Sequence, residues 1–190
     1  MSKILGCLFL TLLLSVITIY PALAQIPKAT STQTISPVKI NSYELFYPIV
    51  AGITEGDFWY NLKLLREAIA EKLTFGDIKK ADYHLILSKK RLVEAEKLLL
   101  VKKDLANAKK TLEKSTRELK TALSLAQTAQ EKGKKVKDLY QAISSEASKE
   151  VLFLASLKAQ LQPDWQDPVQ KAQEAAGSVI AEIQVININQ

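Results

Sequence analysis

Cysteine and histidine are almost absent from this chain of 190 residues, which contains one of each. The cysteine, Cys7, lies in a leader segment that we predict is removed, so the mature chain would carry no thiol. That excludes disulfide bonds and thiolate metal sites as sources of stability. His84 alone cannot form a metal site, because metal coordination needs several converging ligands. We therefore expect a fold that depends on packing alone, without metal or cofactor.

Glycine is also scarce, with six residues in the whole chain. No glycine-rich loop or nucleophile elbow is present to cradle a phosphate or position a nucleophile. The carboxylate pairs Glu67 with Glu71 and Glu94 with Glu96 could in principle perform acid–base chemistry. Their helical spacing beside lysine and arginine is more typical of a solvated, charged helix face. The sequence accordingly predicts a protein that is not an enzyme.

The one long apolar run stands at the beginning of the sequence. Lys3 precedes an almost wholly apolar stretch, 4–19, and the segment 21–24 ends in the small-residue pattern that signal peptidase recognises. We predict a cleaved signal peptide over residues 1–24. The alternative is an uncleaved anchor, although about 16 apolar residues fall just short of a membrane span. Either reading predicts an exported, extracytoplasmic protein that is secreted, periplasmic or held at the cell surface.

The next two segments differ sharply in composition. Residues 25–42 are rich in serine, threonine and proline and predict a flexible tether. From Tyr43 the chain becomes apolar and aromatic, but proline and glycine interrupt it. We expect this second segment to lie extended across helices, with Phe46, Ile49 and Val50 as its anchors.

The strongest pattern in the chain lies within residues 77–132, where apolar and small residues recur at three- and four-residue steps on either side of Asp104. Side chains at this spacing fall on one face of a helix and keep that face turned toward a neighbouring helix. The pattern predicts a long antiparallel hairpin of two helices, 78–102 and 105–132. Asp77 and Asp104 are the expected N-caps, and Gly133 is the expected C-cap.

Three shorter stretches complete the helical pattern. A first helix is predicted over 57–73, capped by Thr54 or Asp57, with its apolar stripe packed on the hairpin. A fourth is predicted over 136–161 and a fifth from about residue 167, with a tail after 183 that is either frayed helix or extended chain. The fold class is therefore all-α: one domain, 43–190, in which about five helices form a largely antiparallel up-down bundle with the hairpin as its spine.

Positive charge gathers on this hairpin. Residues 77–137 contain 17 Lys and Arg against 8 Asp and Glu, a balance of +9, whereas 138–190 contain 3 against 7, a balance of −4. Most lysine runs only keep a protein soluble. If the charge is functional, an exported protein would meet anionic lipid headgroups or acidic polymers, and the lack of interleaved aromatic residues argues against nucleic acid. The candidate anion contacts are Lys89, Lys90, Arg91, Lys102, Lys103, Lys109 and Lys110.

A set of motifs resembles a known family. It comprises Tyr60 to Glu67 (YNLKLLRE), then 73–76 (LTFG), 79–81 (KKA), 84–85 (HL) and 91–95 (RLVEA). In order and spacing these motifs resemble a bacterial family of exported helical domains, domain of unknown function 5667. The resemblance covers residues 48–134 well and the last helices loosely. It implies an exported all-helical domain and supplies no catalytic residues.

Together these observations predict a non-enzymatic, exported structural or interaction module. Its partner would be an anionic envelope lipid or polymer, or another helical protein, since heptad stripes pair equally well within a chain or between chains. A periplasmic holdase-like chaperone is the alternative, and an enzyme is the third reading. A chaperone would leave part of the hairpin's inner face open, whereas a closed bundle would bury it.

Overall fold

The computed structural model describes residues 39–188. The predicted signal peptide, Cys7 and most of the predicted tether lie outside these residues. No strand occurs among the described residues, so the prediction of an all-α fold is confirmed. The helical elements are α2 (Ser42–Phe46), α3 (Tyr60–Leu73), α4 (Asp77–Glu96), the π-helical turn η1 (Lys97–Lys102), α5 (Leu105–Glu131), α6 (Lys137–Ala159), the 3₁₀ turn η2 (Pro163–Trp165) and α7 (Asp167–Ile188).

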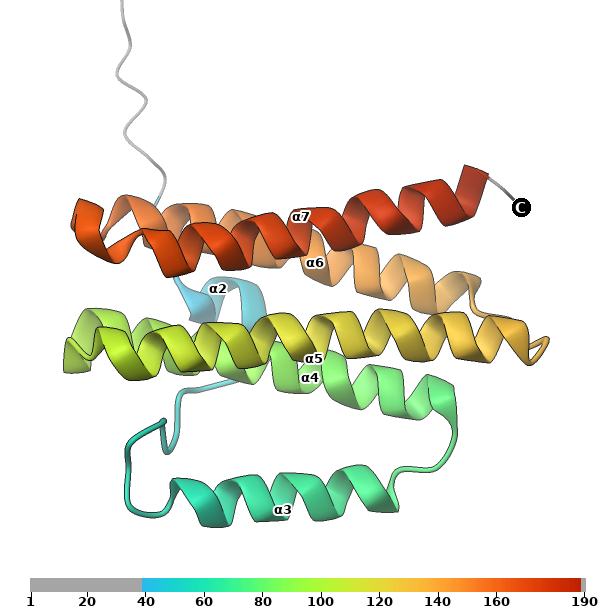
Figure 1. Ribbon diagram of the computed structural model, residues 1–190, viewed down its shortest axis with the longest axis horizontal. Helices are drawn as coiled ribbons and strands as arrows, with labels where there is room; N and C mark the ends of the chain where they lie inside the picture. Colours follow the sequence, from blue (N-terminus) through green and yellow to red (C-terminus); the bar gives the residue numbers. More distant parts are fainter. Residues whose placement is uncertain (1–38, 189–190) are drawn as a thin grey trace, which may run out of the picture. The chain divides into compact units, whose positions relative to one another are not determined.

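The predicted hairpin is formed by α4, η1 and α5, which pack against each other along their length. α6 packs mainly on α7, and α7 also contacts α5, so these four helices close around a common core. Figure 1 shows the hairpin as the middle layer, with α6 and α7 on one side and α3 on the other. The long helices alternate in direction, as expected of an up-down bundle.

The heptad pattern marks the buried side of the hairpin correctly. Its apolar and small residues are buried, apart from Ile78 and Leu105, which are half-buried, and the apolar ones divide into two clusters along the bundle. Between the clusters lies a buried polar layer in which the Ser88 hydroxyl donates to Glu150 of α6 at 2.6 Å and lies 3.0 Å from the Ser115 hydroxyl. The inner face of the hairpin is therefore closed by α6 and α7.

The ends of the hairpin helices confirm one of the three predicted caps. The Asp104 carboxylate accepts a hydrogen bond from the Asn107 backbone N–H at 3.0 Å, which confirms it as an N-cap. The C-cap of α5 is Lys132, one residue before the predicted Gly133, which ends the helix with φ of 73°, a left-handed conformation that glycine adopts at little cost. Asp77 was predicted as a cap but is the first residue of α4, after Gly76.

The start of α3 also differs from the prediction. Trp59 occupies the cap position and makes no side-chain cap bond. Asp57 and Thr54 instead close a turn with each other, because the Asp57 carboxylate accepts from the Thr54 backbone N–H at 2.8 Å. The predicted cap at Thr54 or Asp57 was therefore wrong, and the helix begins three residues later than expected.

The segment predicted to be extended contains a short helix, α2. Phe46 is buried and meets the Phe153 ring edge-on at 5.4 Å, so this predicted anchor is confirmed. Val50 is 71% exposed and does not anchor the segment. Ser42 already belongs to α2, and the Ile40 backbone N–H donates to Ser156 at 2.8 Å, so ordered contacts begin inside the range predicted as a tether.

The last helix settles the open question about the tail, because α7 continues to Ile188 without an extended segment. Its buried side chains, from Val169 to Ile183, recur at three- and four-residue steps and complete both apolar clusters. Within residues 39–188, no helix combines the length and the apolar character needed to span a membrane.

Candidate functional site

Helix α3 contacts the bundle with its polar side and turns its apolar side outward. Tyr60 and Glu67 are its buried residues. The residues that the sequence pattern placed against the hairpin are all exposed, by 51% to 87%: Phe58, Leu62, Leu65, Ile69 and Leu73. α3 contributes no residue to either apolar cluster. The prediction that the first helix packs its apolar stripe on the hairpin was therefore wrong.

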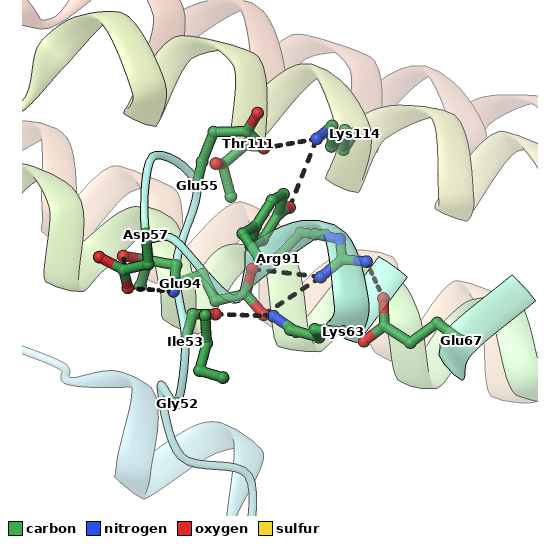
Figure 2. Close-up of polar contacts among 12 residues, drawn as sticks. Gly52, Ile53, Glu55, Asp57, Lys63, Glu67, Arg91, Glu94, Thr111 and Lys114 are labelled. Carbon is green, nitrogen blue, oxygen red and sulfur yellow. Dashed lines mark hydrogen bonds and ion pairs between the residues drawn. The ribbon is translucent and has the colours of Figure 1, made fainter. Parts of the chain in front are cut away.

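A buried ionic cluster holds α3 against α4 in this orientation (Figure 2). Arg91 of α4 donates through Nη1 to the two carboxylate oxygens of Glu94 at 3.1 and 3.2 Å, and through Nη2 to Glu67 of α3. Lys63 of α3 pairs with the same Glu94 and donates to the carbonyl of Ile53 at 2.9 Å. Two cations thus face two carboxylates, and the charges balance inside the contact.

Burial has the largest influence on both cations of this cluster. It lowers the pKa of Lys63, and the ion pair with Glu94 offsets only part of that effect. Burial also acts to lower the pKa of Arg91, but the neighbouring Glu94 and Glu67 outweigh it and hold this pKa above its usual value. Arg91 therefore stays charged wherever the protein is folded. Removing one partner of a buried ion pair typically costs about 3–5 kcal/mol, so the cluster is a strong orienting contact.

Two further ion pairs fix the loop that leads into α3. Glu55 pairs with Lys114 of α5, and Asp57 pairs with Lys102 at the end of η1. The hydrogen bond from Lys102 is the main reason why the pKa of Asp57 falls from 3.8 to about 2. Every one of these links between α3, its leading loop and the hairpin is polar. The outward apolar side of α3 is free of them.

A groove of about 700 Å³ lies beside α3, bounded by the segment 50–53 and by α4. Arg66 and Lys90 line it, and neither has an ion-pair partner within the part of the chain that the structure describes. Most of the remaining lining is apolar: Val50, Ile53, Trp59, Leu62, Leu65 and Ile69. The groove and the exposed apolar side chains of α3 form one continuous surface, which we call the α3 face.

Three of the seven predicted anion contacts are already occupied. Arg91 is 2% exposed within the ionic cluster, so its prediction as a surface anion contact was wrong. Lys89 lies 3.5 Å from Glu146 of α6, and Lys102 is paired with Asp57. Arg91 is therefore closed to an external anion, whereas Lys89 and Lys102 are partly exposed and already have a carboxylate partner within the fold.

The other four predicted contacts have no ion pair among residues 39–188, but they do not gather on one surface. Lys90 lines the groove beside α3. Lys109 lines a separate, smaller groove together with Lys171 of α7. Lys103 follows η1, and Lys110 is exposed on α5. The basic face predicted for the hairpin is thus divided between different sides of the bundle.

The carboxylate pairs considered for acid–base chemistry serve as structural contacts. Glu67 and Glu94 are buried ion-pair partners, so their interpretation as part of a solvated face was wrong. Glu96 accepts hydrogen bonds from the backbone and hydroxyl of Ser42 and so ties α2 to α4. Each of these carboxylates is engaged by a donor from another helix.

The single histidine connects three helices. His84 of α4 is buried, with Nδ1 at 2.6 Å from Glu118 of α5 and Nε2 at 3.6 Å from Glu71 of α3. Sequence reasoning found no partner for it, because both carboxylates are distant along the chain. No group of three or more histidine, cysteine or acidic side chains within residues 39–188 is arranged to hold a metal ion.

The fold and this surface define the class of the protein: a helical-bundle domain with one helix whose apolar side faces outward. Residues 52–189 match the family model described as Domain of unknown function (DUF5667), which spans well over half of the chain. The chain therefore belongs to that family, and the resemblance seen in its helical motifs is confirmed. Neither the curated proteins nor the solved structures contain a match to this chain.

Proposed function

We propose that this domain is a non-enzymatic, exported interaction module that docks through the α3 face onto an anionic lipid surface. The observation that carries the proposal is the orientation of α3, whose polar residues are buried in an ionic cluster while its leucine and isoleucine side chains face outward. Apolar patches of this kind on otherwise soluble proteins mark interaction sites.

The composition of the α3 face favours a lipid surface. An interfacial helix places leucine and aromatic side chains into the boundary of the acyl chains and keeps lysine and arginine near the headgroups. α3 has Phe58 and Trp59 at one end and Phe75 just beyond the other, and all three are exposed. Arg66 and Lys72 are exposed on the same helix, against one partly exposed carboxylate, Glu71. This surplus of positive charge is complementary to anionic headgroups, each basic residue contributing about 1 kcal/mol near such a surface.

Flotation with lipid vesicles tests the proposal. The purified protein should float with vesicles of anionic phosphatidylglycerol, should float less with zwitterionic phosphatidylcholine, and should release partly as salt rises from about 0.01 M to about 0.15 M. Leu65→Asp together with Ile69→Asp should reduce binding at least about tenfold, equivalent to 1.4 kcal/mol. All variants carry the same residues before the helical domain, so differences in vesicle binding between variants report on the substituted positions.

The matched control is Leu152→Asp on α6, since Leu152 is 55% exposed and Leu65 is 57% exposed. This control should float like the wild type. If the α3 double variant keeps its helical content and still floats like the wild type, the α3 face is not the docking surface. Binding to acidic polymer that survives the α3 changes would identify the polymer, and not lipid, as the partner.

Because α6 and α7 close the inner face of the hairpin, the holdase alternative would need the exposed α3 face for an unfolded client. It predicts that the protein suppresses aggregation of a denatured enzyme at stoichiometric amounts and that phosphatidylglycerol vesicles are not required. The α3 double variant should then lose this suppression. Lipid binding without suppression favours docking, and suppression without lipid binding favours the chaperone.

A further inference from the structure

The groove beside α3 combines an apolar lining with charged side chains. Leu62, Leu65 and Ile69 of α3 line it together with Val50 and Ile53 of the preceding segment. Its volume of about 700 Å³ lies within the range of about 300–1,000 Å³ that small-molecule sites occupy. From Trp59 to Ile69 the lining extends about 15 Å along α3, at 1.5 Å per residue. This length and this apolar lining suit an aliphatic chain.

The charged edge of the groove has a net positive balance. Among its lining residues, Glu67 and Glu94 are engaged by Arg91 and Lys63. Arg66 and Lys90, the remaining charged residues of the lining, pair with no carboxylate in residues 39–188. Their positions on α3 and α4 place one guanidinium and one ammonium on the two helices that border the groove. An anionic group is the complement of this pair.

We propose that the groove binds a single acyl chain with an anionic headgroup, the chain against Leu62, Leu65 and Ile69 and the headgroup near Arg66 and Lys90. This inference rests on the proposed function, because the acyl chain would come from an anionic lipid of the surface onto which the protein docks. The shared chemistry, an aliphatic tail and one negative charge, also fits a free fatty acid.

The fluorescence of Trp59 reports directly on occupancy. Trp59 lines the groove, while the chain's other tryptophan, Trp165, packs against the second apolar cluster and can be replaced by phenylalanine. In the Trp165→Phe protein, laurate below its micelle concentration should shift Trp59 emission to the blue with saturation at one equivalent. Dodecylammonium, which has the same chain length and the opposite charge, should bind at least about tenfold more weakly.

Variants with matched controls locate the site. Leu65→Gln should weaken laurate binding several-fold, whereas Leu152→Gln on α6 should leave it unchanged. Arg66→Glu should remove the preference for laurate over dodecylammonium, and Arg117→Glu, an exposed arginine of α5, should keep it. Circular dichroism of each variant confirms that the bundle remains folded.

Three results would overturn the inference. Laurate that leaves Trp59 emission unchanged would mean that the groove takes no acyl chain. Equal affinity for laurate and dodecylammonium would show that Arg66 and Lys90 do not bind an anionic headgroup. A wild-type dimer that Leu65→Gln dissociates would make the groove an interface between two copies.

These outcomes are separable from the proposed docking function. Flotation with anionic vesicles in the absence of laurate binding would refute the acyl-chain site and leave membrane docking intact. Saturable laurate binding without flotation would support the site for a free fatty acid and refute docking at a membrane. A phosphatidylglycerol with short, soluble chains distinguishes a membrane lipid from a free fatty acid as the preferred source.

Discussion

Replacing Glu150 by glutamine should remove a pH dependence of stability that originates in the centre of the bundle. Glu150 is fully enclosed and accepts a hydrogen bond from Ser88, and the carboxylate of Glu146 and the ammonium of Lys89 lie near it. Burial is the dominant effect and raises the pKa of Glu150 from 4.5 to about 8, while Ser88 and Lys89 oppose the rise and Glu146 adds to it. The side chain is therefore protonated, and so neutral, in most folded molecules at pH 7.

The sign of the effect follows from proton binding in the two states. Below about pH 4.5 the folded and unfolded chains both hold the proton, so the group has no effect on the pH dependence there. Between about pH 4.5 and 8 only the folded state retains it, so the free energy of unfolding falls by about 1.4 kcal/mol per pH unit. Over the full window the loss is on the order of 5 kcal/mol.

Urea unfolding followed by circular dichroism measures this loss, with the midpoint and slope taken from linear extrapolation. The wild type should lose stability steadily from about pH 5 to about pH 8, and Glu150→Gln, which is always neutral, should show little of this slope. The variant should therefore be the more stable protein at alkaline pH. Glu113→Gln, at an exposed position of α5, is the control and should follow the wild type. Parallel pH curves for wild type and Glu150→Gln would refute a buried, neutral Glu150.

Three further predictions concern α3, the glycines and the lysines. Arg91→Met should detach α3 from the bundle, because it removes the central cation of the ionic cluster. Proteolysis and amide exchange should become faster in α3 while the other helices stay folded, and unchanged protection of α3 would show that the ionic cluster does not hold it. Gly133→Ala, at φ of 73°, should lower the free energy of unfolding by about 1 kcal/mol, whereas Gly177→Ala, inside α7 with open space around it, should raise it by about 0.5–1 kcal/mol in urea titrations. Reversal of Lys109 and Lys110 to glutamate should leave vesicle flotation within about threefold of wild type if the α3 face is the contact; a loss as large as that of the α3 double variant would return the function to the hairpin.

The long elements could be predicted because their physical signals are local. The heptad spacing within 77–132 could be recognised from the helical period alone. The predicted helix 105–132 ends one residue after α5, and the predicted helix 78–102 includes the whole of η1. Asp104 and Gly133 act on backbone groups a few residues away, so their roles were visible in the sequence. The cap of α3 was missed because Asp57 is drawn into a bond with Lys102, which lies 45 residues away in the chain.

The site could not be predicted in the same way, because an amphipathic pattern specifies two faces of a helix without specifying which one meets the protein. α3 shows apolar residues at three- and four-residue steps, which normally indicates the buried side. A second signal was present: Tyr60, Lys63 and Glu67 follow the same spacing on the opposite side, and Arg91 and Glu94 repeat it on α4. Complementary charges at matching spacing on two helices would have indicated a polar contact between them.

The orientation of α3 reflects two competing free-energy contributions of similar size: burial of its apolar side chains and pairing of the buried charges. Turning α3 over would bury its leucine and isoleucine side chains, and complete burial of one such side chain is worth about 1.5–3 kcal/mol. The same rotation would cover Arg91 and Glu94 with apolar atoms and remove Glu67 and Lys63 from them, and leaving a buried charge without its partner costs about 3–5 kcal/mol. Because α3 presents several apolar side chains, the gain and the cost are of the same order. The proposed lipid surface would remove the cost of the present orientation, because it would cover the apolar side while the ionic cluster stays intact. The buried charges of α4 therefore act as the element that directs the apolar side of α3 outward, and contact with lipid would strengthen this orientation.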